Sequence, residues 1–134
     1  MAENTRIEGP AALVRTRLPD RRRSVIREFQ VDGHYFTAAL GLDPESGEIK
    51  ELFLTGAKEG GGLAAILDDA SVMISVALQY GVPAKALAKS VGRVPARPLA
   101  PTELGMGARV PSAPASVIGA ALDLLVEEAG EGAR

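Results

Sequence analysis

The chain has 134 residues, of which 46% are hydrophobic and 24% charged, and its formal net charge is −2. This length suits one domain that buries about two-thirds of its unfolded surface. The slightly acidic balance and the 4% aromatic content argue against a chain built mainly to hold nucleic acid, which needs basic patches and stacking rings. The chain has no Cys, so disulfides, Cys nucleophiles and iron–sulfur clusters are excluded.

The first part of the chain reads as a flexible, Arg-containing tail over residues 1–22. No apolar signal-peptide core precedes Pro10, and no segment approaches the roughly 20 apolar residues of a membrane span. We therefore expect a cytoplasmic protein with no membrane partner.

Three strand-like runs follow, over residues 24–31, 34–42 and 48–55. Asp32-Gly33 joins the first two, and Asp-Gly favours a type I′ hairpin turn because both residues adopt positive φ. The turn-forming stretch 43–47 joins the second and third. Such short connections predict an antiparallel meander.

A Gly-rich loop over 56–62 leads into a long helix, about 63–80, in which apolar residues recur at helical spacing. Val72 and Val76 widen its apolar stripe, so we expect this central helix to be buried on more than one side. Gly81 is expected to end it in the left-handed conformation. Pro83 is expected just inside a short second helix, about 83–91.

The remaining chain is predicted to form a Pro/Gly-rich arm over 93–113, a helix over 114–128 and a frayed tail over 129–134. The core domain is then 23–92. The fold class that follows is α+β: a three-stranded antiparallel meander packed by a long central helix and two shorter helices.

Seven basic residues are the candidate contacts for an anion or a protein partner: Arg21, Arg22, Arg23, Lys58, Lys85, Lys89 and Arg93. The three arginines precede the first strand and form either a solvated run or a docking patch. Lys58 lies in a Gly-rich loop but precedes the glycines, so the phosphate-loop order is absent. The last three residues follow one another at four-residue spacing, which predicts one basic edge.

Other polar residues predict no catalytic, metal or cofactor site. Asp68 and Asp69 are helix neighbours that point about 100° apart, so they cannot address one metal. Ser71 and Ser75 lie one turn apart and are expected to bond back to the helix or to let a second helix approach closely. His34, the chain's one His, follows a turn. Its pairing with Glu51 as an acid–base couple is a minor hypothesis.

Several stretches together resemble the TSCPD domain family, over roughly residues 18–93. They are Leu18-Pro19-Asp20-Arg21-Arg22-Arg23-Ser24, Glu51-Leu52-Phe53-Leu54, Gly56-Ala57-Lys58 and, most specifically, Ile74-Ser75-Val76-Ala77-Leu78-Gln79-Tyr80-Gly81-Val82-Pro83. This family occurs at the C-terminus of adenosylcobalamin-dependent ribonucleotide reductases and as standalone proteins.

The chain departs from the family at the Cys-containing motif that names it. The nearest match is Ser112-Ala113-Pro114-Ala115, with Ala113 at the Cys position, so a redox or metal role does not carry over. The helix start is expected to carry over, with Ser112 or Ala113 preceding a first turn that contains Pro114.

The resemblance implies association with deoxyribonucleotide synthesis rather than catalysis by this chain. Ribonucleotide reduction needs a thiyl radical, a Cys pair and a large barrel, so adenosylcobalamin would belong to a partner reductase and this chain would bind no cofactor itself. The expected partner is a reductase or a second copy of the chain in a homodimer. The alternative is a nucleotide- or nucleic-acid-binding module that uses the seven basic residues.

Overall fold

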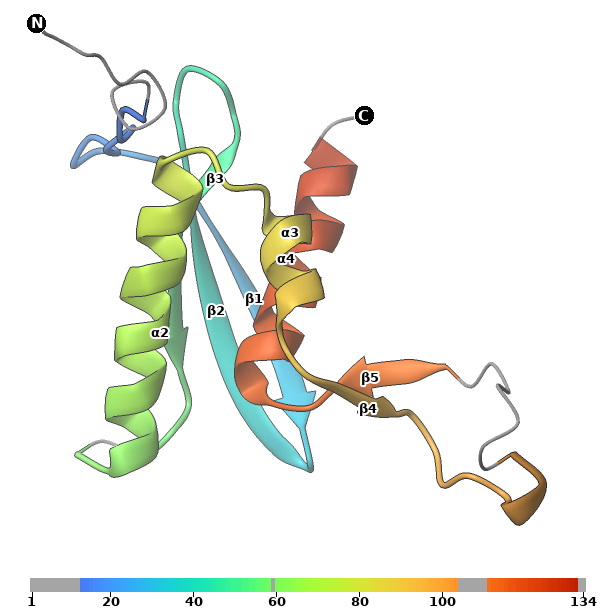
Figure 1. The fold of residues 1–134 in the computed structure, drawn as a ribbon. Helices are drawn as coiled ribbons and strands as arrows, with labels where there is room; N and C mark the ends of the chain where they lie inside the picture. Colours follow the sequence, from blue (N-terminus) through green and yellow to red (C-terminus); the bar gives the residue numbers. More distant parts are fainter. Residues whose placement is uncertain (1–12, 59, 104–110, 133–134) are drawn as a thin grey trace, which may run out of the picture.

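A computed structural model describes residues 13–58, 60–103 and 111–132. Three strands come first, β1 (Ser24–Val31), β2 (His34–Leu42) and β3 (Ile49–Thr55). The helices α2 (Gly62–Gln79) and α3 (Ala84–Ser90) follow. The chain continues through β4 (Arg93–Pro95), the short 3-10 helix η1 (Pro101–Glu103), β5 (Ser112–Pro114) and α4 (Val117–Gly132). Figure 1 shows this α+β arrangement, which confirms the predicted fold class.

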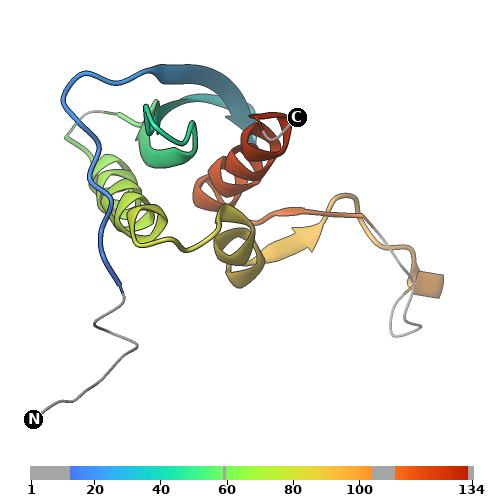
Figure 2. The same ribbon diagram turned by 90° about the horizontal axis from the view of Figure 1, so that it is seen from above.

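The three long strands form one antiparallel sheet in the order β1-β2-β3. The predicted hairpin turn is confirmed, because Asp32 and Gly33 have φ values of 50° and 80° and Val31 pairs with His34. Both residues thus adopt the positive φ that a type I′ turn requires. The helices lie on one side of this sheet (Figure 2).

The hydrophobic core lies between the inner face of the sheet and the helices. Alternate residues of β2 and β3 point inward because successive strand side chains face opposite ways. The buried apolar side chains are Phe36, Ala38, Leu40, Leu52 and Leu54 from the strands, and Leu67, Ile74, Leu78, Ala88, Ala121, Leu122 and Leu125 from the helices. Helix α2 packs along β3, and α3 packs on α4.

Helix α2 is buried on one side only, so the expectation that it is covered on more than one side was wrong. Leu67, Ile74 and Leu78 face the core, whereas Val72 is exposed and Met73 is 69% exposed. The apolar stripe is as wide as predicted, but α2 packs on β3 at one edge of the sheet, so the rest of the stripe faces away from the sheet. By length and composition alone α2 could cross a membrane, although 33% of its span is buried within the protein.

Two segments without a predicted structure are ordered by contacts with the body. In the described part of the N-terminal segment, Thr16 N donates to Gln79 O over 2.8 Å. In the Pro/Gly-rich arm, β4 and β5 pair in an antiparallel ribbon with Val94 opposite Ala113. This ribbon projects from the body of the domain (Figure 1). Residues 1–12, which belong to the predicted tail, lie outside the described residues.

Two helix starts differ from the expectation. Pro83 is the N-cap of α3 and not its first helical residue. Helix α4 begins at Val117, because Ser112–Pro114 form β5 instead of preceding a helical turn. The side chain that caps α4 is Ser116, whose Oγ accepts a hydrogen bond from Gly119 N over 3.2 Å.

Candidate functional site

The seven basic residues occupy separate parts of the molecule. Lys58 precedes the N-terminal end of α2, while Arg21–Arg23 lie near its C-terminal end (Figure 1). An 18-residue helix is about 27 Å long. Lys85 and Lys89 are exposed on α3, and Arg93 begins β4. The structure therefore divides the seven residues among the N-terminal segment, the loop before α2, and α3 with the start of β4, so no single basic face unites all seven.

Arg22 fixes the N-terminal segment to the sheet. Its Nε and Nη2 donate to the two carboxylate oxygens of Glu51 over 2.8 and 2.9 Å, and its Nη1 donates to Pro19 O over 2.8 Å. Such a bidentate pair has a fixed geometry, and both side chains are mostly buried. Arg21 and Arg23 on either side of it are exposed, so they remain open to a partner.

Arg93 fixes the β4–β5 ribbon to helix α4. Its Nη1 donates to both carboxylate oxygens of Asp123 over 3.2 Å, and its Nε donates to Ser112 Oγ over 2.8 Å. One guanidinium thereby joins β4, β5 and α4. The Arg93 side chain is thus bonded to two residues of the chain, and a role in holding the arm accounts for these contacts.

Gly41 provides the space that the Arg22–Glu51 pair needs. It lies opposite Glu51 in the sheet, and a Cβ at this position would stand 2.5 Å from Glu51 Oε1 and 3.2 Å from Leu18 Cδ1. Only a residue without a side chain lets the carboxylate and the N-terminal segment lie across β2 here.

Ser71, Ser75 and Gln79 of α2 cover the free edge of β3, with bonds to Leu54, Leu52 and Lys50 respectively. Ser71 Oγ accepts from Leu54 N over 3.2 Å and donates to Leu67 O. Ser75 Oγ accepts from Leu52 N over 2.9 Å, and Gln79 Nε2 donates to Lys50 O over 3.0 Å. We call these three side chains the edge ladder, because they satisfy the strand edge.

The edge ladder explains part of the family-like segment 74–83. The expected bond back to the helix is confirmed for Ser71, which donates to Leu67 O. Both Ser71 and Ser75 also bond to the chain's own sheet, so β3 takes the place that the sequence suggested for a second helix. Gln79 reaches in two directions, since its Oε1 accepts from Arg15 Nε over 2.6 Å. Gly81 ends the helix at φ 95°, and Val82 N donates to Ala77 O over 3.0 Å. The prediction for Gly81 is thus confirmed.

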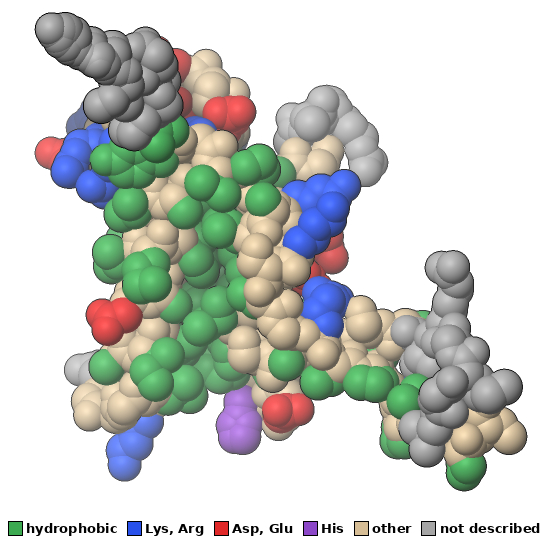
Figure 3. Space-filling view, viewed as in Figure 1, with side chains coloured by type: hydrophobic (Ala, Val, Ile, Leu, Met, Phe, Trp, Pro, Cys, Tyr) green, Lys and Arg blue, Asp and Glu red, His purple; other side chains and the backbone are tan. Residues whose placement is uncertain are grey.

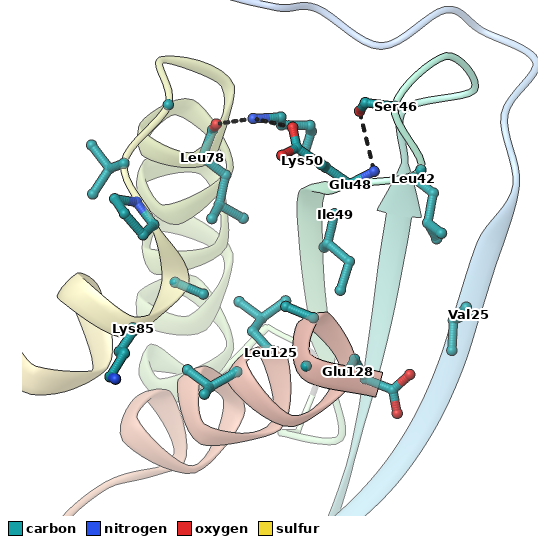
Figure 4. Close-up of a pocket in the computed structure, with 18 residues that line it drawn as sticks. Val25, Leu42, Ser46, Glu48, Ile49, Lys50, Leu78, Lys85, Leu125 and Glu128 are labelled. Carbon is teal, nitrogen blue, oxygen red and sulfur yellow. Dashed lines mark hydrogen bonds and ion pairs between the residues drawn. The ribbon is translucent and has the colours of Figure 1, made fainter. Parts of the chain in front are cut away.

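A groove with a volume of about 920 Å³ opens between the sheet, the α2–α3 turn and α4. Figure 4 shows Ile49, Leu42, Val25 and Leu125 around it, with Lys85 at one side. Most of its polar groups are engaged: Lys50 Nζ lies 3.1 Å from Leu78 O and 3.4 Å from Glu48 Oε1. Glu128 is bound to Arg27. An apolar groove of this kind can bind a molecule.

The minor hypothesis of a His34–Glu51 couple does not fit the geometry. His34 is exposed at the turn end of β2, and Glu51 lies opposite Gly41 near the other end. Seven strand residues separate the two positions, about 23 Å, and Glu51 is bound to Arg22. Within the described ranges, no group of three or more His, Asp or Glu could hold a metal ion.

Sequence reasoning missed the residues that receive these bonds. Glu51, Asp123 and Lys50 lie 29, 30 and 29 positions from Arg22, Arg93 and Gln79, so no local pattern joins them. The signal for the edge ladder was present as the four-residue spacing of Ser71, Ser75 and Gln79. Its partner strand was not identifiable from that spacing.

Comparison with known proteins gives one consistent result. The model of a family described as TSCPD domain matches residues 10–125. A vitamin B12-dependent ribonucleotide reductase of Rhodopirellula baltica is 34% identical over 105 residues, which cover 75% of this chain and 10% of that protein. The reductase of Streptantibioticus cattleyicolor is 36% identical over 89 residues, 60% of this chain and 15% of that protein.

Shorter matches reach higher identity. A vitamin B12-dependent ribonucleotide reductase of Streptomyces clavuligerus is 40% identical over 70 residues, 52% of this chain and 7% of that protein. The chain thus spans about a tenth of the length of these curated relatives. No solved structure matches the chain significantly.

Proposed function

Because the chain belongs to the TSCPD domain family, we propose that it is a non-catalytic accessory module that binds a B12-dependent ribonucleotide reductase. It would then act in deoxyribonucleotide synthesis, in the cytoplasm. The observation that carries this proposal is the match of 75% of the chain to a tenth of such a reductase.

The chemistry of the chain supports an accessory role. Reduction of a ribonucleotide depends on Cys residues, and this chain has none. In the groove, the Lys50 and Glu128 side chains are held by neighbours within the chain. Of the seven candidate residues, Arg21, Arg23, Lys58 and the Lys85–Lys89 pair are exposed, and such cations suit contact with an acidic surface.

The residues that line the groove include no imidazole that could coordinate a cobalt ion. Imidazole is a common metal ligand in proteins, but His34 is the one His of the chain and is exposed at the β1–β2 turn. It does not line the groove. We therefore propose that adenosylcobalamin belongs to the reductase partner.

A binding experiment with two forms of the reductase tests the proposal. The chain is titrated against a purified B12-dependent reductase from the same genome, or against the Rhodopirellula baltica relative. One form is intact, and the other lacks the segment that matches this chain. We expect saturable binding to the truncated form and weaker binding to the intact form, because its own segment competes.

The activity of the same samples gives a second readout. The chain alone should reduce no ribonucleotide, and its addition should raise the activity of the truncated reductase. Absence of binding to both forms at about 100 μM would contradict the proposal, since specific complexes of standard size bind far more tightly.

A further inference from the structure

Helix α2 carries a second apolar face that nothing in the described structure covers. Its residues follow a heptad spacing of three and four: Leu63, Ile66, Ala70, Met73, Ala77 and Tyr80. We call them the heptad stripe. Its four large side chains are 41–69% exposed. This is the a/d pattern by which helices pair in coiled coils, and it lies beside the face that packs on β3.

The surroundings of the heptad stripe are also apolar. Val72 is exposed next to it, and α2 contains two charged residues, Asp68 and Asp69, with no Lys or Arg. Figure 3 shows hydrophobic side chains along α2 and in the hollow beside it. A helix whose outer face meets water is normally polar on that face, so this surface has the composition of an interface.

We propose that a second copy of this chain covers the heptad stripe, with the two α2 helices antiparallel. A two-fold axis at the middle of the stripe sets Ala70 opposite Met73 of the second copy, and Ile66 opposite Ala77 of the second copy. Each of these layers pairs a large side chain with a small one. Leu63 then meets Tyr80 of the second copy at both ends. The stripe is therefore complementary to itself.

The exposed area is sufficient for a reversible dimer. With on the order of 100 Å² from each large side chain, the four large residues of the stripe and Val72 give about 500 Å² per copy, or about 1,000 Å² in total, the lower bound of specific interfaces. The dimer should accordingly be weak and concentration-dependent, with a dissociation constant on the order of micromolar or above.

Sedimentation velocity over a wide concentration range tests the interface with two matched variants. Ile66 in the stripe and Ile26 on the outer face of the sheet are both 58% exposed. We expect Ile66→Glu to weaken self-association at least tenfold, because each copy would then bury a charge in the apolar interface between the two heptad stripes. Ile26→Glu should leave the dimer unchanged. Circular dichroism checks that both variants fold.

Cross-linking tests the orientation and does not depend on the Glu variants. Since the chain has no Cys, single introduced thiols are unambiguous. An equimolar mixture of Ala70→Cys and Met73→Cys proteins should oxidise mainly to the mixed dimer, which mass spectrometry identifies. Two parallel helices would instead give the two unmixed dimers.

Four results would overturn the proposal. They are a monomer at every concentration, loss of the dimer in Ile26→Glu but not in Ile66→Glu, preference for unmixed disulfides, and a monomer that binds phosphatidylcholine–phosphatidylglycerol vesicles through α2. The last would make a lipid surface the occupant of the stripe. None of these readouts involves the reductase, so they are independent of the proposed function.

Discussion

The hydroxyl of Ser75 makes both edge hydrogen bonds of Leu52. It accepts from Leu52 N over 2.9 Å and donates to Leu52 O over 3.2 Å. Both residues are buried, so water does not replace these bonds easily. A single side chain on α2 thereby satisfies the donor and the acceptor that β3 would otherwise offer to another strand.

Ser75→Ala should destabilise the protein by about 1–3 kcal/mol, because it leaves a buried N–H and a buried C=O without partners. Ser90→Ala is the matched control: Ser90 also lies on a helix and bonds to Ala86 O, but it is exposed. That change should remain within about 0.5 kcal/mol. Urea unfolding measures both, and equal effects would contradict the role of the edge ladder.

Gln79→Met should release the N-terminal segment from the body. The substitution keeps the length of the side chain but removes the bonds to Arg15 Nε and Lys50 O. We expect trypsin to cleave after Arg15 and Arg17 faster than in the parent protein. Gln30→Met, on the exposed side of β1, should leave the cleavage rate unchanged. An unaltered rate in Gln79→Met would show that the segment is held elsewhere.

Gly41→Ala should destabilise the protein by about 1–3 kcal/mol through overpacking, because the new methyl would press on Glu51 Oε1 at 2.5 Å. Gly130→Ala gives the opposite expectation. A Cβ on Gly130 of α4 meets nothing within 4 Å, so higher helix propensity should raise stability by up to about 1 kcal/mol. Thermal unfolding measures the stability of both variants. A stability change of the same sign in both would contradict the packing argument.

Arg93→Ala should loosen the β4–β5 ribbon while the core remains intact. The guanidinium is about one-third exposed, as is Asp123, so the loss in global stability should stay at about 1 kcal/mol or less. Amide hydrogen exchange should accelerate at Arg93, Val94, Ser112 and Ala113, the non-proline residues of the ribbon, and stay unchanged in β2. Equal acceleration in both regions would indicate global destabilisation instead.

Binding of nucleotides or DNA should be weak and sensitive to salt. Lys58 and the Arg21–Arg23 run lie near opposite ends of α2, and Arg22 and Arg93 are paired with carboxylates. Fluorescence anisotropy at low and moderate salt measures this, with single-stranded DNA, double-stranded DNA and nucleotides as probes. Affinity that survives moderate salt and falls in Lys85→Ala would support specific recognition.

The local chemistry of the chain was sufficient to predict its regular elements. Asp32-Gly33 indicates the hairpin, the alternation of Phe36, Ala38 and Leu40 indicates the buried face of β2, and Gly81 indicates the end of α2. Each of these signals acts over a few residues, because it depends on backbone dihedral angles or on side-chain periodicity.

The contacts that arise from tertiary structure could not be predicted. In the β4–β5 ribbon, Arg93 bonds to Ser112, which is 19 positions away in the sequence. A strand of three residues is also too short for its side-chain pattern to be recognised. Apolar periodicity marked α2 as a helix, but it did not distinguish the side that meets β3 from the side that meets solvent. Which side of α2 is covered depends on how many helices and strands the rest of the chain supplies to pack against it.

The repeat of helix α2 and the repeat of strand β3 differ slightly, and this mismatch limits the length of the edge ladder. Four helical residues rise about 6 Å and turn about 400°, whereas two strand residues advance about 6.6 Å. Each rung therefore falls short by about half an ångström and rotates about 40° away from the strand. Two rungs are within reach of a Ser hydroxyl, and the third is made by the longer Gln79. A fourth rung would require a longer side chain still, so α2 can protect an edge only about as long as β3.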